Sequence, residues 1–195
     1  MSNRDTIRFV SRTYTLKARA QRQDETRRRI VDAAVELHQT IGPDATTITD
    51  VAERAGVGRV TVYRHFPDER ALLQACSGHF FAQHPFPDLE PWRAIADRRE
   101  RAQRGVREAH AWFRATEAMM SKTLPGMRDH EVVAPYHAYW REAADVLAGP
   151  RAGKLARAAA ALALSFDTWR TLTRDERLTD GQAARIAVGL AAGAP

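Results

Sequence analysis

The stretch that decides the fold is TITDVAERAGVGRVTVYRHF, residues 47–66, because its spacing is that of two short helices joined by a tight turn. Thr47 and Asp50 have the spacing of a capping box, in which each side chain accepts a hydrogen bond from an amide at the start of the first helix. Gly56 lies where the turn needs a positive φ, which glycine adopts at little cost. The spacing predicts a helix-turn-helix, with the second helix at about residues 58–66.

The outward face of that second helix has the chemistry of a DNA-reading surface. We expect Val51, Ala55, Val57 and Val62 to point inward and hold the two helices together. The residues left outward carry hydrogen-bond donors and no negative charge: Arg59, Val60, Thr61, Tyr63, Arg64 and His65. Val60 would suit a thymine methyl group, and a helix with this face can enter the major groove. The sequence therefore predicts binding to double-stranded DNA.

The rest of the chain reads as helical, because apolar residues recur at spacings of three and four. The first stripe is Ile30, Ala33, Ala34, Leu37 and Ile41, closed by Gly42 and Pro43. Asp68 can cap a helix that buries Leu72, Leu73, Cys76 and Phe80, and a connector follows at residues 85–91. Beyond it we expect two helical stretches to about residue 122, a break at 125–126, and helices at about 131–147, 151–173 and 179–192. The fold class is all-α.

Positive charge is concentrated at the N-terminus. Residues 1–30 hold nine Arg or Lys against three acids, which accounts for the whole net charge of +6. A basic segment beside a DNA-binding domain attracts phosphates and releases their counterions. Residues 1–24 are thus an arm that contacts DNA, a solvated tail, or a product of a wrongly chosen start codon.

Other classes of function find little support. Cys76 is the only cysteine, which fits a reducing compartment, and the first twenty residues lack the apolar core of a signal peptide. The seven histidines show no metal-binding spacing, and there is no glycine-rich phosphate loop or nucleophile motif. We expect a cytoplasmic protein that is not an enzyme and needs no metal or cofactor.

Residues 26–75 resemble the N-terminal domain of the TetR family of repressors. The turn glycine, the Tyr-x-His-Phe signature at 63–66 and the paired leucines that follow carry the resemblance. It implies an all-α homodimer that reads a palindromic operator. It also implies a three-helix DNA-binding domain (25–71) and a helical-bundle domain for ligand binding and dimerisation (72–195), and the basic arm (1–24) before them departs from the family pattern.

The resemblance also implies roles for single residues. Arg59 and Val60 fall where base edges are read, and Thr49 faces the groove. Thr47, Tyr63 and His65 fall where family members hold phosphates. A phosphate-binding lysine is common in the family where this chain has Glu69, so Arg70 or the basic arm is the expected substitute.

The C-terminal half concentrates aromatic and methionine side chains at helical spacing. Such stripes are usually core, but their number predicts a cavity for an apolar or flat aromatic effector. The predicted lining is Trp112, Thr116, Met119, Met120, Tyr136, Trp140, Phe166 and Trp169. Glu117 and Asp167 would select a cation there or form surface salt bridges. The alternative is a DNA-architectural or partner-controlled regulator with no small ligand.

Two segments with small apolar residues on one face are candidates for the dimer interface. The first is residues 158–164 with Leu155 and Phe166, and the second holds Ala184, Ala187, Val188 and Ala191. Small side chains allow helices to approach closely, and the resemblance places a four-helix interface here. The alternative is a purely monomeric core.

Overall fold

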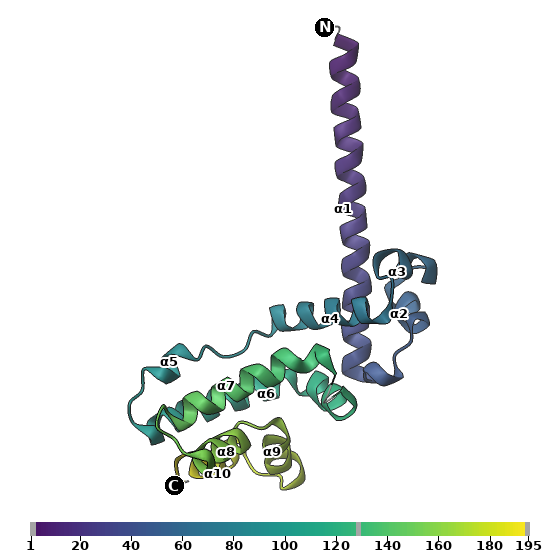
Figure 1. The fold of residues 1–195 in the computed structure, drawn as a ribbon. Coiled ribbons are helices and arrows are strands. Elements are labelled where there is room, and N and C mark those ends of the chain that lie inside the picture. The colour runs from purple at the N-terminus through teal and green to yellow at the C-terminus, as the bar shows by residue number, and fades with distance from the viewer. Residues whose placement is uncertain (1–2, 128–129, 194–195) are drawn as a thin grey trace. The chain divides into compact units, whose positions relative to one another are not determined.

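The computed structural model describes residues 3–127 and 130–193, with side chains from residue 17 onward (Figure 1). Within these residues every regular element is helical, which confirms the all-α class. The chain forms two compact units, residues 1–80 and 81–195. The division falls late in helix α4 (Glu69–Gln83), whereas the sequence placed a domain boundary at 71/72, in its first turn. Each unit is described by itself below.

The N-terminal unit holds the predicted helix-turn-helix. Its other elements are α1 (Asn3–Thr40), the 3-10 turn η1 (Pro43–Ala45), α2 (Ile48–Ala55) and α3 (Arg59–His65). Helix α1 packs against α2, and α2 packs against α3. The core side chains are at most 8% exposed and include Ile30, Ala34, Leu37, Val51, Val62, Phe66, Leu72, Cys76 and Phe80. Ile41 was wrongly placed in this core, because it follows the last residue of α1 and is 48% exposed.

Helix α1 begins far earlier than the apolar stripe indicated. Residues 1–41 contain no glycine or proline, and residues 17–29 are mostly Arg, Lys, Gln, Glu and Ala, which favour helix. The helix is therefore continuous from Asn3 (Figure 1). No side chain between residues 17 and 29 is buried, so helix propensity rather than packing accounts for this extension.

Side-chain contacts fix α1 against the other helices of its unit. The Arg27 guanidinium lies 4.7 Å from the centre of the Phe66 ring, directly after α3. Glu36 accepts a hydrogen bond from Arg54 of α2, and Asp32 lies 3.0 Å from His79 of α4. Helix α1 is thereby held to α2, to α4 and to the residue that follows α3.

The C-terminal unit is a bundle of helices around an aromatic core. It contains α5 (Glu90–Arg93), α6 (Arg98–Met127), η2 (Glu131–Val133), α7 (Ala134–Ala148), α8 (Lys154–Ala163), α9 (Phe166–Arg170), the π-helical turn η3 (Thr171–Asp175) and α10 (Asp180–Gly193). Helix α8 packs against α7 and α10, and α10 also packs against α6. No helix among the described residues is both long enough and apolar enough to span a membrane.

Two boundaries in this unit were predicted wrongly. Helix α6 continues through Pro125 to Met127 instead of breaking there. Pro125 lies so close to the end of the helix that it removes one backbone hydrogen bond and no long helical segment follows it. The helix expected at 151–173 is divided, because the Ser165 hydroxyl accepts a hydrogen bond from the Thr168 amide at 3.4 Å and starts α9 as a new helix.

Candidate nucleic-acid interface and small-molecule pocket

The turn between α2 and α3 has the geometry that the sequence predicted. The Thr47 amide donates to Asp50 Oδ2 at 2.9 Å, and the Asp50 amide donates to Thr47 Oγ1 at 3.2 Å, which completes the capping box. At the other end of α2, Gly56 adopts φ 64° and ψ 40°, the left-handed region. The Val57 amide then donates to Ala52 O at 3.0 Å, closing the helix before the chain turns into α3.

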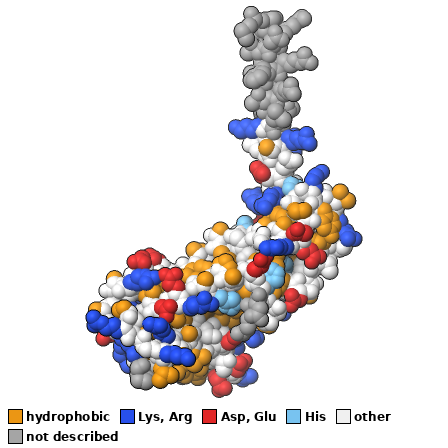
Figure 2. Space-filling model, in the orientation of Figure 1, with side chains coloured by type: hydrophobic (Ala, Val, Ile, Leu, Met, Phe, Trp, Pro, Cys, Tyr) orange, Lys and Arg blue, Asp and Glu red, His pale blue; other side chains and the backbone are white. Residues whose placement is uncertain are grey.

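Helix α3 separates a buried anchor from an exposed reading face. Val62 is fully buried and Phe66, directly after the helix, is 2% exposed. On the opposite side Val60 is 82% exposed and Tyr63 43% exposed. Arg59 and Arg64 are exposed as well, while Thr61 and His65 are half-buried. Figure 2 shows apolar and cationic side chains together over this part of the unit. An apolar side chain this exposed does not stabilise the fold by burial.

The three residues expected to hold phosphate differ from one another in how accessible their polar atoms are. Tyr63 is 43% exposed, so a phosphate can approach its side chain from solvent. The Thr47 hydroxyl already donates its one hydrogen to Asp50 Oδ2 at 2.7 Å, so a phosphate contact would compete with the capping box. His65 turns Nε2 inward, where it has no hydrogen-bond partner among the described residues. Burial, and then Arg64 and Arg27, lower its pKa, so at neutral pH it would offer a neutral ring.

The capping box makes the stability of the DNA-binding unit depend on pH. Hydrogen bonds from Thr47 lower the pKa of Asp50 below its usual value near 3.8. Because the folded pKa is the lower one, the stabilisation is complete above that value and is lost as pH falls through the folded pKa. We expect Asp50→Ala to lower the free energy of unfolding at pH 7, and the difference from wild type to shrink toward pH 3. Denaturant titrations across that range measure it, and a difference independent of pH would contradict the role of the carboxylate.

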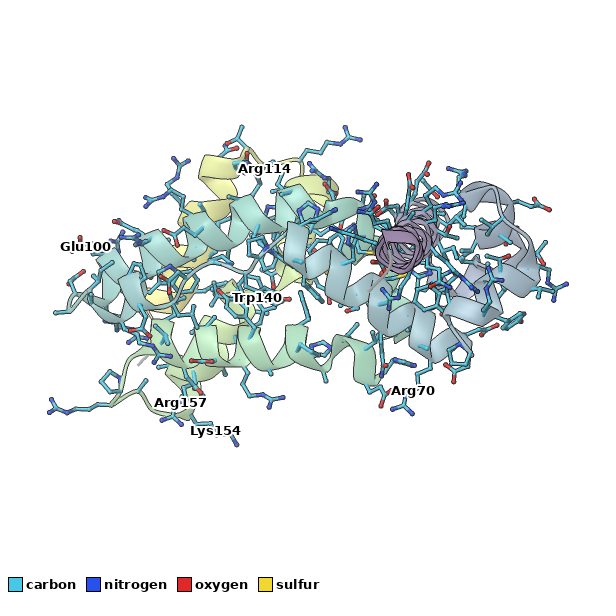
Figure 3. The ribbon with its side chains drawn as sticks, turned by 90° about the horizontal axis from the view of Figure 1, so that it is seen from above. Arg70, Glu100, Arg114, Trp140, Lys154 and Arg157 are labelled. Atoms are coloured by element: carbon cyan, nitrogen blue, oxygen red, sulfur yellow. The ribbon has the colours of Figure 1, made fainter. Side chains whose placement is uncertain are left out.

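The start of α4 carries the departure from the family pattern. The Asp68 carboxylate accepts a hydrogen bond from the Ala71 amide at 2.7 Å, as predicted, and begins the helix. Glu69 and Arg70 are both exposed in the first turn, and Figure 3 shows Arg70 extending outward from α4. Arg70 as a substitute for the missing lysine stays a prediction.

In the C-terminal unit, all eight residues predicted to line a ligand cavity are buried. Several lie in one aromatic cluster: the Trp112 and Trp140 ring centres are 5.6 Å apart, and those of Phe166 and Trp169 are also 5.6 Å apart. Phe113 lies between these pairs, 4.7 Å from Trp140 and 6.1 Å from Trp169. Phe113 was not among the residues predicted to line the cavity, although it lies on the same helix as Trp112.

A pocket of about 350 Å³ opens beside this cluster, between α7 and the segment that joins α8 to α9. It is lined by Leu124, Tyr136, His137, Trp140, Arg141, Ala161, Leu164, Ser165, Phe166 and Asp167. Three predicted residues, Tyr136, Trp140 and Phe166, are among them. The other five, Trp112, Thr116, Met119, Met120 and Trp169, are buried but do not line it.

Trp140 is the notable side chain of this pocket. Figure 3 shows it between α6 and α7, and its indole nitrogen is enclosed without a hydrogen-bond partner among the described residues. A buried N–H without an acceptor costs free energy that a ligand acceptor can recover. Asp167, named in the sequence analysis, also lines the pocket. Glu117 does not, and instead forms a two-point ion pair with Arg174 at 2.7 and 2.5 Å.

The connector before α5 is held to α6 and α7 by contacts that the sequence reading missed. Phe86 stacks on Tyr139 with ring centres 4.3 Å apart and on Trp112 at 5.1 Å. The Tyr139 hydroxyl donates to Pro87 O at 2.7 Å, and the Trp112 indole N–H donates to His84 O at 3.2 Å. An isolated phenylalanine within a proline-rich stretch was the signal that could have identified this anchor.

Helices α8 and α10 expose large apolar side chains. Leu155 and Leu162 of α8 are 66% and 52% exposed, and Ile186 of α10 is 44% exposed. Because α8 and α10 pack against each other, these side chains belong to two neighbouring helices. Leu155 and Leu162 belong to the first segment predicted for the dimer interface, whereas Ala187, Val188 and Ala191 of the second segment are buried within the unit.

Comparison with known proteins agrees with this geometry. Residues 30–76 match the family model described as bacterial regulatory proteins, tetR family. The HTH-type transcriptional regulator SrpR of Pseudomonas putida is 39% identical over 80 residues, which are 37% of this chain and 37% of that protein. The class D tetracycline repressor protein of Escherichia coli is 36% identical over 58 residues, 30% of this chain and 27% of that one. The chain thus spans about a third of the length of these curated relatives.

Solved structures extend the likeness to both units. A TetR-like transcriptional regulator from Rhodococcus has a TM-score of 0.60 at 15% identity, covering 85% of this chain and 93% of that one. The regulator FadR of Bacillus subtilis, solved with stearoyl-CoA, has a TM-score of 0.58 at 15% identity, with coverages of 85% and 97%. These matches confirm the fold of a helix-turn-helix domain joined to a helical domain. Residues 30–76 thus carry the sequence pattern of the tetR family of bacterial regulatory proteins.

Proposed function

We propose that this protein is a cytoplasmic, dimeric transcriptional repressor that binds a palindromic DNA operator through α3 and releases it when a small molecule binds the C-terminal unit. The exposed face of α3 carries the proposal. A helix that holds Val62 inward and leaves Val60 82% exposed between Arg59 and Arg64 has the surface needed for base edges and phosphates. The relative named as a tetracycline repressor, which aligns over 58 residues, supports the repressor assignment.

The exposed leucines of α8 and the isoleucine of α10 support dimerisation. Burying Leu155, Leu162 and Ile186 against a second copy would remove three large apolar side chains from water. A two-fold dimer carries two α3 helices, one for each half-site of a palindrome.

The 350 Å³ pocket is the proposed effector site. Its aromatic walls, Tyr136, Trp140 and Phe166, favour an apolar or flat aromatic body, and the Trp140 N–H favours one acceptor on it. A ligand that displaces Trp140 or Tyr136 would disturb Phe86, since their ring centres lie within 6.4 Å of it. Phe86 belongs to the connector that continues from α4, so the change would pass along the chain toward the DNA-binding unit.

Arg59→Ala tests the DNA-reading role of α3. We expect it to weaken binding to the operator by about 1–3 kcal/mol, because a bidentate contact to guanine would be lost. Fluorescence anisotropy with the operator, selected from random duplexes by the wild-type protein, measures this loss. Binding to a scrambled duplex should change little, and Arg107→Ala, which removes an exposed charge from α6, is the matched control. An equal loss on both duplexes would assign Arg59 to phosphate instead of bases.

The effector model is tested by the same binding assay. A ligand found by screening should weaken operator binding, and the operator should weaken the ligand by the same factor. Trp140→Phe, which removes the indole N–H, should reduce ligand affinity without changing operator affinity. Operator binding that no pocket ligand alters would favour the ligand-independent regulator.

A further inference from the structure

Arg101 of α6 is a buried cation without a carboxylate partner. It is only 7% exposed, and all of its hydrogen bonds go to backbone carbonyls. Nε donates to Leu147 O at 3.2 Å, and Nη1 donates to Ile95 O at 2.7 Å and to Ala96 O at 3.3 Å. A guanidinium has five N–H donors, so the two on Nη2 have no acceptor within the described part of the chain. Buried charge of this kind favours a counter-ion.

Arg101 lines a hollow whose charges are all positive. The hollow has a volume of about 530 Å³ and is lined by Ala96, Arg98, Arg101, Ala148, Gly149, Pro150, Arg151, Ala152, Gly153 and Ala156. Three arginines face it and no acidic residue does. Its remaining wall is made of small apolar side chains, which leave room for a compact organic body beside the charged group.

The N-terminus of α8 opens onto the same hollow. Gly153 is its N-cap, no side chain caps the helix, and its first turn has no acidic residue. The first amide N–H groups of a helix have no intrahelical acceptor and carry partial positive charge, which favours anions. Gly153 and Ala156 both line the hollow, so these amides lie at its wall. Figure 3 shows Lys154 and Arg157 extending from this end of α8.

Two acids that line a second hollow with Arg101 are already paired. Glu142 and Asp145 line a neighbouring hollow of about 600 Å³ that Arg101 also borders. Glu142 accepts a hydrogen bond from Arg93, and Asp145 lies 3.7 Å from Arg157. Arg101 forms no ion pair with either, so its charge remains available to the first hollow.

We propose that this hollow binds an oxyanion, the phosphate or carboxylate group of a small molecule, between Arg101 Nη2, Arg151 and the open amides of α8. The site shares no lining residue with the pocket at Trp140, so it is a second small-molecule site. Its volume lies within the range of small-ligand pockets. The inference does not depend on DNA binding, because it concerns only the C-terminal unit.

Isothermal titration of the full chain with inorganic phosphate and with acetate tests the proposal. We expect saturable binding of at least one, and the tighter probe identifies the ligand group. Gly153→Asp should abolish it, because the new carboxylate would cap α8 and repel the anion. Gly153 has φ −73° and ψ 175°, and a Cβ there meets nothing within 4 Å, so the aspartate fits the fold.

Arg151→Ala is the second variant, and we expect it to weaken anion binding about tenfold by removing a charged donor. Arg107→Ala, which removes an exposed charge from α6 outside the hollow, should bind as wild type does. Circular dichroism establishes that each variant is folded. Absence of saturable binding of both probes to wild type would overturn the proposal, as would equal binding by wild type, Gly153→Asp and Arg151→Ala.

Discussion

Leu162→Glu is expected to convert the proposed dimer to a monomer and to reduce operator affinity more than about 100-fold. Leu162 is 52% exposed on α8 and would be buried against a second copy. The substitution places one carboxylate from each subunit in that interface, and an uncompensated buried charge costs about 3–5 kcal/mol. A monomer holds a single half-site, so the loss passes directly to operator binding.

Sedimentation velocity and anisotropy on the same samples measure both effects. Ile41→Glu is the matched control, because Ile41 is also an exposed apolar residue, at 48%, but lies in the N-terminal unit. It should leave the assembly dimeric. A Leu162→Glu protein that remains dimeric at micromolar concentration would place the interface elsewhere.

Phe113→Ala is expected to destabilise the C-terminal unit by about 3–5 kcal/mol. Phe113 is fully buried, and its ring centre lies 4.7 Å from that of Trp140 and 5.8 Å from that of Phe166. Removing the ring leaves a cavity that these large neighbours cannot fill without changing rotamer.

Tryptophan fluorescence during denaturant unfolding reports this loss selectively. All four tryptophans, Trp92, Trp112, Trp140 and Trp169, lie in the C-terminal unit. Phe113→Leu keeps most of the volume and should lose much less stability. A loss below about 0.5 kcal/mol for Phe113→Ala would indicate that the cluster is loosely packed.

The helix-turn-helix could be predicted from the sequence because its determinants are local. Thr47 and Asp50 cap α2 within one turn. Gly56 adopts its positive φ at little cost because glycine has no side chain. The exposure of Ile41 and the early start of α1 could not be predicted from such local signals. The apolar stripe marks only the buried part of α1, whereas helix propensity continues the helix through residues 17–29, none of which is buried.

The ligand-binding half was predicted less well because its geometry depends on distant contacts. Burial of the eight aromatic, threonine and methionine residues follows from helical periodicity. Which of them border empty space depends on where Ser165 divides the expected helix and how α8 and α9 then pack. Similarly, Arg101 meets Leu147, Ile95 and Ala96 only after α6 and α7 have come together.

We propose above that the exposed face of α3 reads DNA sequence. The most direct test is the ratio of dissociation constants for the selected operator and a scrambled duplex, measured with the full chain at physiological salt. We expect a preference for the operator of about 1,000-fold or more, as for specific DNA-binding proteins in general. Equal affinity for the two duplexes, falling together as salt is raised, would show binding to phosphates alone and contradict it.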